Sequence, residues 1–230
     1  NMKAGDQKII GEKYHRSDNR IKDQKDFNVN VYPIVEVMNS KILQNTKKSS
    51  SIYNYNALAT NTIMNYVIFK TGDDFQKLLN KVFKEDAKIK YSVFFHKTIR
   101  TRYLDQEKGE YGRYSFYAHR YDYLRIAKAV MDHWNNDTCV GKYLKTVYER
   151  RINKNREGYN TQSASQYSKK YGGQFHFDII GLTKRKILAM DGFGGQQIII
   201  DFDKERIIVV NSRDRHYNWK KIVHKKLKQK

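Results

Sequence analysis

Four short runs near the C-terminus constrain the fold of this chain more than any other feature. Each run is rich in β-branched or aromatic residues, and a turn signal separates it from the next. In chain order they are GQFHFDII (173–180), RKILAM (185–190), QQIIIDF (196–202) and RIIVVNS (206–212). The connections are too short for a crossover helix, so neighbouring runs must pair antiparallel. The sequence therefore predicts an antiparallel meander over residues 173–212.

Helical spacing of apolar residues dominates the chain before this meander and returns after it. The predicted helices cover residues 33–44, 58–72, 73–83, 120–134, 140–151 and 216–229. Asp73 or Asp74 is expected to cap the third of them. Residues 96–117 and the polar stretch 153–173 are expected to be loops. Helices followed by a meander and by a helix able to cover one sheet face indicate an α+β architecture.

Two side-chain arrangements follow from these periods. In the helix over 120–134 the predicted apolar stripe is Tyr123, Leu124, Ile126, Ala127, Val130 and Met131. In the first run of the meander, His176 and Asp178 are two residues apart, so we expect them to share one face of the strand. A hydrogen-bonded structural histidine is the favoured reading of His176.

The chain is strongly basic, with 45 Lys and Arg against 24 Asp and Glu and a formal net charge of +21. Such an excess favours contact with phosphates when it is clustered. Here the positive residues occur throughout the chain and in no recognisable nucleic-acid-binding motif, so we interpret them as solvated surface. Nucleic acid is not the expected partner, and the basic helix over 216–229 is the best candidate for an anion-binding patch.

Several classes of protein are disfavoured by the residues that are scarce. Cys139 has no second cysteine to pair with, and no Cys/His cluster has zinc-ligand spacing, so we expect no metal and no cofactor. The apolar stretches are too short to span a bilayer. The first 16 residues do not have the pattern of a signal peptide. Any leader would lie upstream of Asn1, so periplasmic and cytoplasmic locations both stay open, as does the oligomeric state.

Three segments, in matching order and spacing, resemble motifs of the serine β-lactamase and penicillin-binding-protein-like hydrolases of class C type. They are NMKAGD at the start, YNALATNTIMNYVIFKTG (55–72), and YGGQFHFDIIGL with MDGFGGQQIIIDFDKERIIVV (171–182 and 190–210). The resemblance implies a single β-lactamase-like domain over 1–230 whose N-terminal part is missing. Its mainly helical part would be 1–165, and its sheet and C-terminal helix 166–230. The implied activity is hydrolysis of a small-molecule ester or amide through an acyl-enzyme.

The same resemblance assigns roles to particular residues. Tyr55 would be a catalytic proton shuttle, and Asn56 would orient the substrate. Phe193, Gly194 and Gly195 would form the strand edge that lines the substrate cleft, and the backbone N–H of Gln196 would donate to the oxyanion. The chemistry explains the glycines, because preorganised backbone donors stabilise a developing oxyanion best where no side chain blocks its approach.

The chain also departs from the family pattern. The family nucleophile is the serine of a Ser-x-x-Lys motif, and no serine from Ser17 to Ser212 has a lysine three residues later. We expect that motif upstream of Asn1 and the 230 residues by themselves to be inactive. Ala57 replaces the motif asparagine, and Phe193 replaces a Lys, His or Trp. The third motif thus supplies no cation for a substrate carboxylate, which favours an ester or amide over a β-lactam.

Two other interpretations stay open. A catalytically inactive member of the family would bind peptides or cell-wall fragments without turnover. A basic nucleic-acid-binding protein is the more distant alternative. The glycines at 192, 194 and 195, taken alone, are explained as well by a β-bulge as by an oxyanion site.

Overall fold

A computed structural model describes residues 74–91, 93–99, 112–154, 164–192, 194–212 and 217–229, together with Tyr53 and scattered positions between 60 and 71. The described residues fall into two compact units. The first holds those from Thr60 to Asn80 and Val93–Tyr117. The second holds Tyr53, the residues from Lys81 to Tyr91, and everything from Ala118 onward. Each unit is described by itself.

The first unit contains helix and a two-stranded sheet. The helix predicted over 58–72 is confirmed at its described positions, which are Thr60, Ile63, Met64, Tyr66, Val67, Lys70 and Thr71. The next helix, α6 (Phe75–Leu79), continues as the π-helix η3 (Asn80–Asp86), whose residues from Lys81 onward belong to the second unit. Asp74 occupies its N-cap position, but the Asp74 side chain makes no capping hydrogen bond. The predicted helix over 33–44 and residue Asp73 lie outside the described residues.

The expectation of a loop over 96–117 is wrong for residues 96–99 and 112–117, while residues 100–111 lie outside the described residues. The strands β1 (Phe94–Ile99) and β2 (Gly112–Tyr117) pair antiparallel, with Phe94 opposite Tyr117 and Ile99 opposite Gly112. Both strands are rich in aromatic and β-branched residues, which favour strands. β1 does not alternate between polar and apolar residues, but Arg113–Phe116 in β2 does, so the period-two signal of a strand was present in β2 and was missed.

The second unit is built on a six-stranded antiparallel sheet in the order β3-β4-β5-β6-β7-β8. The strands are β3 (Ile152–Asn153), β4 (Ser168–Gly172), β5 (Phe175–Ile179), β6 (Ile187–Asp191), β7 (Gln197–Asp201) and β8 (Arg206–Val210). The predicted meander and the α+β class are thereby confirmed. The stretch 153–173, expected to be a loop, instead includes β4 and the short helix α9 (Ala164–Tyr167).

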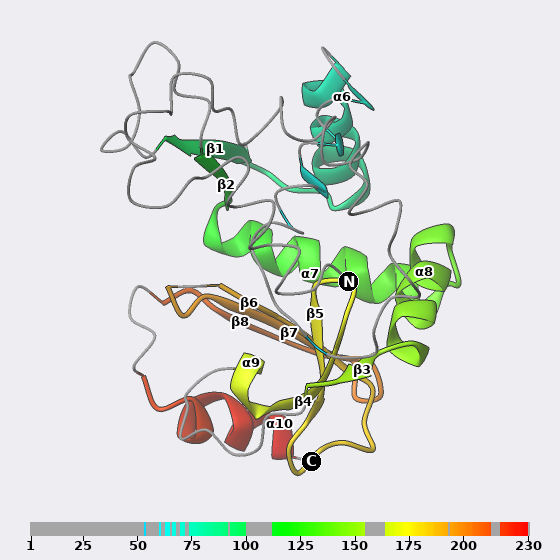
Figure 1. Cartoon of the computed structure of the whole chain (residues 1–230), viewed down its shortest axis with the longest axis vertical. Helices are drawn as coiled ribbons and strands as arrows, with labels where there is room; N and C mark the ends of the chain where they lie inside the picture. Colours follow the sequence, from blue (N-terminus) through cyan, green and yellow to red (C-terminus); the bar gives the residue numbers. More distant parts are fainter. Residues whose placement is uncertain are drawn as a thin grey trace, which may run out of the picture. The chain divides into compact units, whose positions relative to one another are not determined.

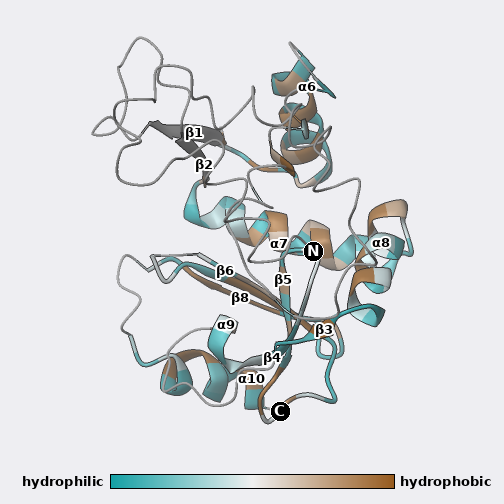
Figure 2. Ribbon diagram, in the orientation of Figure 1, coloured by the Kyte–Doolittle hydropathy of each residue, from teal (hydrophilic) through white to brown (hydrophobic). Residues whose placement is uncertain are grey.

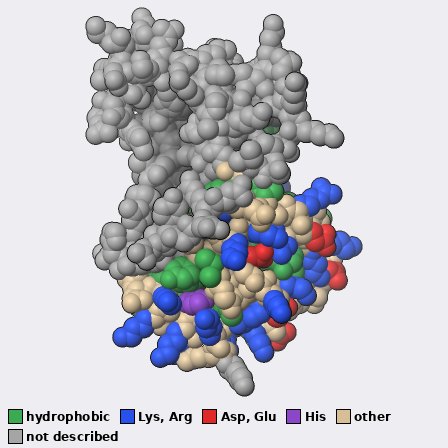
Figure 3. Space-filling model, turned by 60° about the horizontal axis from the view of Figure 1, so that its bottom comes forward, with side chains coloured by type: hydrophobic (Ala, Val, Ile, Leu, Met, Phe, Trp, Pro, Cys, Tyr) green, Lys and Arg blue, Asp and Glu red, His purple; other side chains and the backbone are tan. Residues whose placement is uncertain are grey.

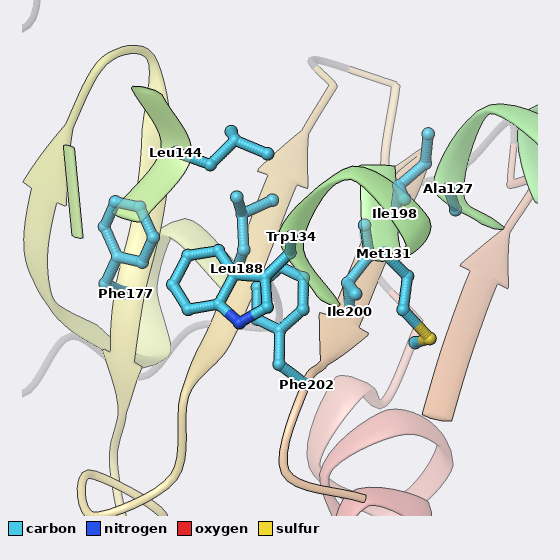
Figure 4. Packing of buried hydrophobic residues seen from close by; sticks show 9 residues of the cluster. All are labelled: Ala127, Met131, Trp134, Leu144, Phe177, Leu188, Ile198, Ile200 and Phe202. Carbon is cyan, nitrogen blue, oxygen red and sulfur yellow. The ribbon is translucent and has the colours of Figure 1, made fainter. Parts of the chain in front are cut away.

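Two helices cover one face of this sheet. They are α7 (Arg120–Asn135) and α8 (Cys139–Glu149), both of which were predicted. Figure 2 shows hydrophobic and hydrophilic bands along them, as expected for amphipathic helices. Their buried side chains meet alternate residues of the strands, and Figure 4 shows the cluster: Ala127, Met131, Trp134, Leu144, Phe177, Leu188, Ile198, Ile200 and Phe202. Leu124, predicted for this stripe, is 44% exposed, so that assignment is wrong.

The C-terminal helix covers the opposite face. It consists of the π-helix η6 (Lys220–His224) followed by α10 (Lys225–Lys228), and Figure 1 shows it across the sheet from α7. Trp219, Val223 and Leu227 are fully buried in a second cluster with residues from β5, β6 and β7. Because helices cover both faces, every residue of β7 is buried, which explains its unbroken run of isoleucines.

At Asp178 the side chains of β5 switch from one face of the sheet to the other. Phe177 packs in the α7 cluster, but Ile179 packs in the cluster of the C-terminal helix. Strict alternation would place both on one face. The backbone of Asp178 has φ = 54°, a conformation that non-glycine residues seldom adopt, and this reverses the alternation.

The side chains of His176 and Asp178 consequently point to different surroundings, so the expectation of a shared face is wrong. Asp178 accepts a hydrogen bond from Arg151 Nε (2.9 Å), and Arg151 stacks on Tyr148. Tyr148 packs against Phe177 on the α7 side. His176 instead lies beside Ser168.

A buried ion pair joins the sheet to the C-terminal helix. Asp201, at the end of β7, is fully buried and contacts the guanidinium of Arg185. Arg185 also donates through Nη1 to the Leu227 carbonyl oxygen (2.7 Å). Loss of one partner would leave a buried charge unpaired, which is far more costly than the pair itself is stabilising.

Candidate functional site

The candidate site is the hairpin that joins β6 to β7, and its geometry explains the glycines there. The Gly192 N–H donates to the Gln196 carbonyl oxygen (2.8 Å), and the Gly195 N–H donates to the Gly192 carbonyl oxygen (3.0 Å). Gly195 has φ = 87°, the left-handed conformation of the bulge residue in a short hairpin loop. A Cβ on Gly194 would lie 2.6 Å from Gln196 Nε2. Gly195 is therefore needed for the turn itself, whereas at Gly194 the nearest atoms belong to the end of the flexible Gln196 side chain, which can move.

The turn leaves one backbone donor available. The N–H of Gln196 donates no hydrogen bond to any residue that the structure describes. The bulge at Gly195 causes this, because the Gly192 carbonyl accepts from Gly195 instead of from Gln196. Gln196 as a whole residue is only partly buried.

Polar side chains hold the hairpin from the side of the C-terminal helix. Gln197 is 2% exposed, and its Oε1 accepts from Trp219 Nε1 (2.6 Å) and from the Ala164 N–H (3.3 Å). Gln197 Nε2 is buried and has no hydrogen-bond partner among the described residues. The Tyr217 hydroxyl donates to the Gly195 carbonyl oxygen (3.2 Å). Burial, together with the charge of Asp191, raises the pKa of Tyr217 to about 12, so this hydroxyl stays protonated.

A buried polar network lies next to the hairpin and comprises Lys154, Ser165, Ser168 and His176. Helix α9 links the two, because the Ser165 N–H donates to Asp191 Oδ2 (3.3 Å). Lys154 Nζ donates to Ser168 Oγ (2.9 Å) and to the carbonyl oxygen of Ser165. Ser168 Oγ lies 3.3 Å from His176 Nδ1.

The charges of this network are set by burial. Lys154, Ser168 and His176 are each at most 6% exposed. Burial, with a smaller effect from the charge of Lys154, lowers the pKa of His176 to about 3. His176 is therefore neutral near pH 7, and Ser168 lies between a lysine and a neutral imidazole. These residue types form nucleophilic sites when they are open to substrate, but here they are enclosed and join β4, β5 and α9.

The structure describes some of the predicted site residues and not others. Gly194, Gly195 and Gln196 come together in the hairpin. Tyr55, Asn56 and Phe193 lie outside the described residues, so the roles expected of them stay predictions. Sequence reasoning missed Gln197, Lys154 and Ser168. A glutamine at the start of an otherwise apolar strand was the signal for Gln197, while Lys154 and Ser168 lay in the stretch that was expected to be a loop.

Within the described ranges, no group of three or more His, Cys, Asp or Glu side chains is arranged to hold a metal ion. Cys139 is exposed, and its thiol is free. No helix in the described part of the chain combines the length and the apolar character needed to cross a membrane. Comparisons of this chain with protein-family models, with curated proteins and with solved structures find no match.

Proposed function

We propose that this chain belongs to a β-lactamase-related serine hydrolase, which cleaves an ester or amide through an acyl-enzyme. The observation that carries the proposal is the unengaged N–H of Gln196 on a hairpin that is anchored at both ends. An oxyanion donor must be free, fixed before the reaction, and unobstructed by side chains. The free N–H of Gln196 and the anchored hairpin support the first two conditions, and Gly194 and Gly195 add no side chain of their own. All three residues lie in the segment that resembles the third family motif.

The proposed mechanism divides the remaining roles as the resemblance implies. A serine of a Ser-x-x-Lys motif would attack the substrate carbonyl carbon, with its lysine taking the proton. Tyr55 would pass that proton to the leaving group, and Asn56 would orient the substrate. The Gln196 N–H would donate to the oxygen as it becomes negative. Since these 230 residues hold no Ser-x-x-Lys, the proposal places the nucleophile outside them, in a β-lactamase-like fold.

The test is made on the protein from the complete reading frame that contains these residues. A fluorophosphonate probe should label a serine outside the 230 residues, and a p-nitrophenyl ester should be hydrolysed. Gln196→Pro removes the N–H and should lower kcat by about 100-fold or more. Gln196→Ala keeps the N–H and should stay near the parent rate. Tyr55→Phe gives a second test away from the hairpin and should also lower kcat by about 100-fold.

Three results would contradict the proposal. They are an absence of probe labelling and hydrolysis, labelling of a serine within the 230 residues, and equal effects of Gln196→Pro and Gln196→Ala in folded proteins. The first would favour a second candidate, which the lack of Ser-x-x-Lys supports: a non-catalytic relative that binds peptides or cell-wall fragments. Calorimetry with muropeptides would then show binding without turnover.

A further inference from the structure

The C-terminal helix carries an unusually uniform charge on its outer side. Residues 217–229 contain five lysines and no acidic residue. Trp219, Val223 and Leu227 face the core, whereas all five lysines are exposed: Lys220, Lys221, Lys225, Lys226 and Lys228. None of the five forms an ion pair with a carboxylate in the described part of the chain. We name these five residues, with Ile222, the lysine face.

Two arginines bond the C-terminal end of this helix. A helix C-terminus carries partial negative charge on its last carbonyl groups. Here Arg206 Nη1 donates to the Lys226 carbonyl oxygen (2.6 Å), and Arg185 Nη1 donates to that of Leu227 (2.7 Å). These arginines satisfy the free carbonyls. Figure 3 shows Lys and Arg side chains distributed over the described part of this side of the molecule. A surface of this kind attracts a polyanion. When a polyanion binds, it reduces the repulsion between the neighbouring lysine side chains.

The composition of the lysine face distinguishes between two kinds of polyanion. Proteins that bind nucleic acid use arginine forks and exposed aromatic rings, which contact phosphates and stack on bases. The lysine face itself has no arginine, and the neighbouring Arg185 and Arg206 are bonded to carbonyl oxygens of the helix. Trp219 is fully buried, and the Tyr217 hydroxyl is bonded to Gly195. The lysine face has instead an apolar side chain, Ile222, which is 51% exposed one turn before Lys225 and Lys226. Lysines around an apolar contact are typical of segments that bind anionic lipid surfaces.

We propose that the lysine face binds the surface of bilayers that contain anionic phospholipids. The apolar side of the helix stays in the core of the protein, so the contact is peripheral. Charge supplies most of the affinity, and Ile222 enters the headgroup region. This inference is independent of the proposed hydrolase activity, since it uses no residue of the hairpin.

The test uses the 230-residue chain with sedimenting vesicles of phosphatidylcholine that contain about one third phosphatidylserine, at near-physiological ionic strength. We expect binding to these vesicles and little binding to pure phosphatidylcholine. Each lysine near such a surface contributes roughly fivefold to the binding constant. The variant Lys225→Gln/Lys226→Gln should therefore bind about 25-fold more weakly. Ile222→Ser should weaken binding by a smaller factor that persists at higher salt.

A matched control has the same loss of net charge elsewhere. Lys128→Gln/Lys142→Gln changes two exposed lysines on α7 and α8, across the sheet from the lysine face, and should bind nearly as well as the parent. Equal weakening by both double variants would overturn the proposal, because it would mean that net charge alone drives binding. Absence of binding to the anionic vesicles would also overturn it. So would tight binding to duplex DNA with none to vesicles, which would assign the lysine face to nucleic acid.

Discussion

Burial shifts the pKa of polar residues in the core of the second unit. His176 is the clearest case, because its pKa of about 3 follows mainly from the loss of water around the ring. The unfolded chain has an ordinary histidine with a pKa near 6.5. Below that pH the unfolded state takes up a proton that the folded state does not. The folded state is therefore destabilised as the pH falls from about 6.5 towards 3.

This linkage predicts a pH-dependent effect of His176→Asn, whose side-chain oxygen can replace Nδ1 as the partner of Ser168. Each pH unit below about 6.5 costs the parent protein up to about 1.4 kcal/mol of unfolding free energy through this one group. Between pH 8 and pH 5 the variant should therefore gain about 2 kcal/mol relative to the parent. Urea unfolding of the parent and the variant at each pH measures the difference in their unfolding free energies. Both proteins contain His224, so its contribution to the pH dependence cancels.

A second histidine variant serves as the control. His119 is exposed and accepts from the Tyr121 N–H at the start of α7. Since asparagine is also a good N-cap, His119→Asn should change the unfolding free energy little at pH 8, which tests the His-to-Asn exchange itself. Parallel pH curves for the parent and His176→Asn would show that His176 is solvated in solution, contrary to its position in the structure.

At the level of elements, the contact between α7 and α8 depends on one residue without a side chain. Gly141 is buried in the first turn of α8, where its N–H donates to the N-cap side chain of Thr138 (3.1 Å). A Cβ at this position would overlap the carbonyl oxygen of His133 and lie 2.7 Å from its carbonyl carbon. The two helices can approach this closely only because residue 141 is glycine.

We expect Gly141→Ala to destabilise the protein even though alanine is the better helix former. Intrinsic propensity favours alanine by about 1 kcal/mol. Overpacking against a backbone atom that cannot move freely costs about 1–3 kcal/mol or more. The net effect should be a lower thermal midpoint. Val140→Ala, at an exposed position in the same turn, should change the midpoint little. A midpoint that rises in Gly141→Ala would mean that α7 and α8 are farther apart in solution.

For the molecule as a whole, the excess of positive charge opposes folding. The net charge of +21 brings like charges together when the chain becomes compact. Ion pairs among the described residues offset this locally, as between Arg151 and Asp178 and between Arg185 and Asp201. Even if each of the 24 Asp and Glu paired with one Lys or Arg, 21 of the 45 positive residues would have no acidic partner.

Screening should therefore stabilise this protein. Raising sodium chloride from about 0.01 M to about 0.15 M shortens the Debye length from about 30 Å to about 8 Å, and the thermal midpoint should rise by several degrees. Calorimetry at fixed pH measures the thermal midpoint, and sucrose of equal osmolality is the uncharged control. A midpoint that falls with salt would show that favourable ion pairs outweigh the repulsion.

The periodic elements of this protein were predictable from its sequence. Local patterns of apolar residues predicted helices α7 and α8, strands β5 to β8 and the C-terminal helix. The helices bury one apolar stripe each, and the side chains of the strands alternate between the two faces of the sheet. The glycine hairpin was also recognisable. The fold class followed from the order of these elements.

Other features depended on partners distant in the sequence. The strand β4 lies in a polar segment and forms because β5 pairs with it. The network of Lys154, Ser168 and His176 exists because the pairing of β3, β4 and β5 brings three unremarkable residues together. The face reversal at Asp178 and the free N–H of Gln196 are properties of backbone torsion and pairing. A sequence pattern records which residues prefer burial, whereas the tertiary structure decides which polar groups meet there and which donor stays unpaired.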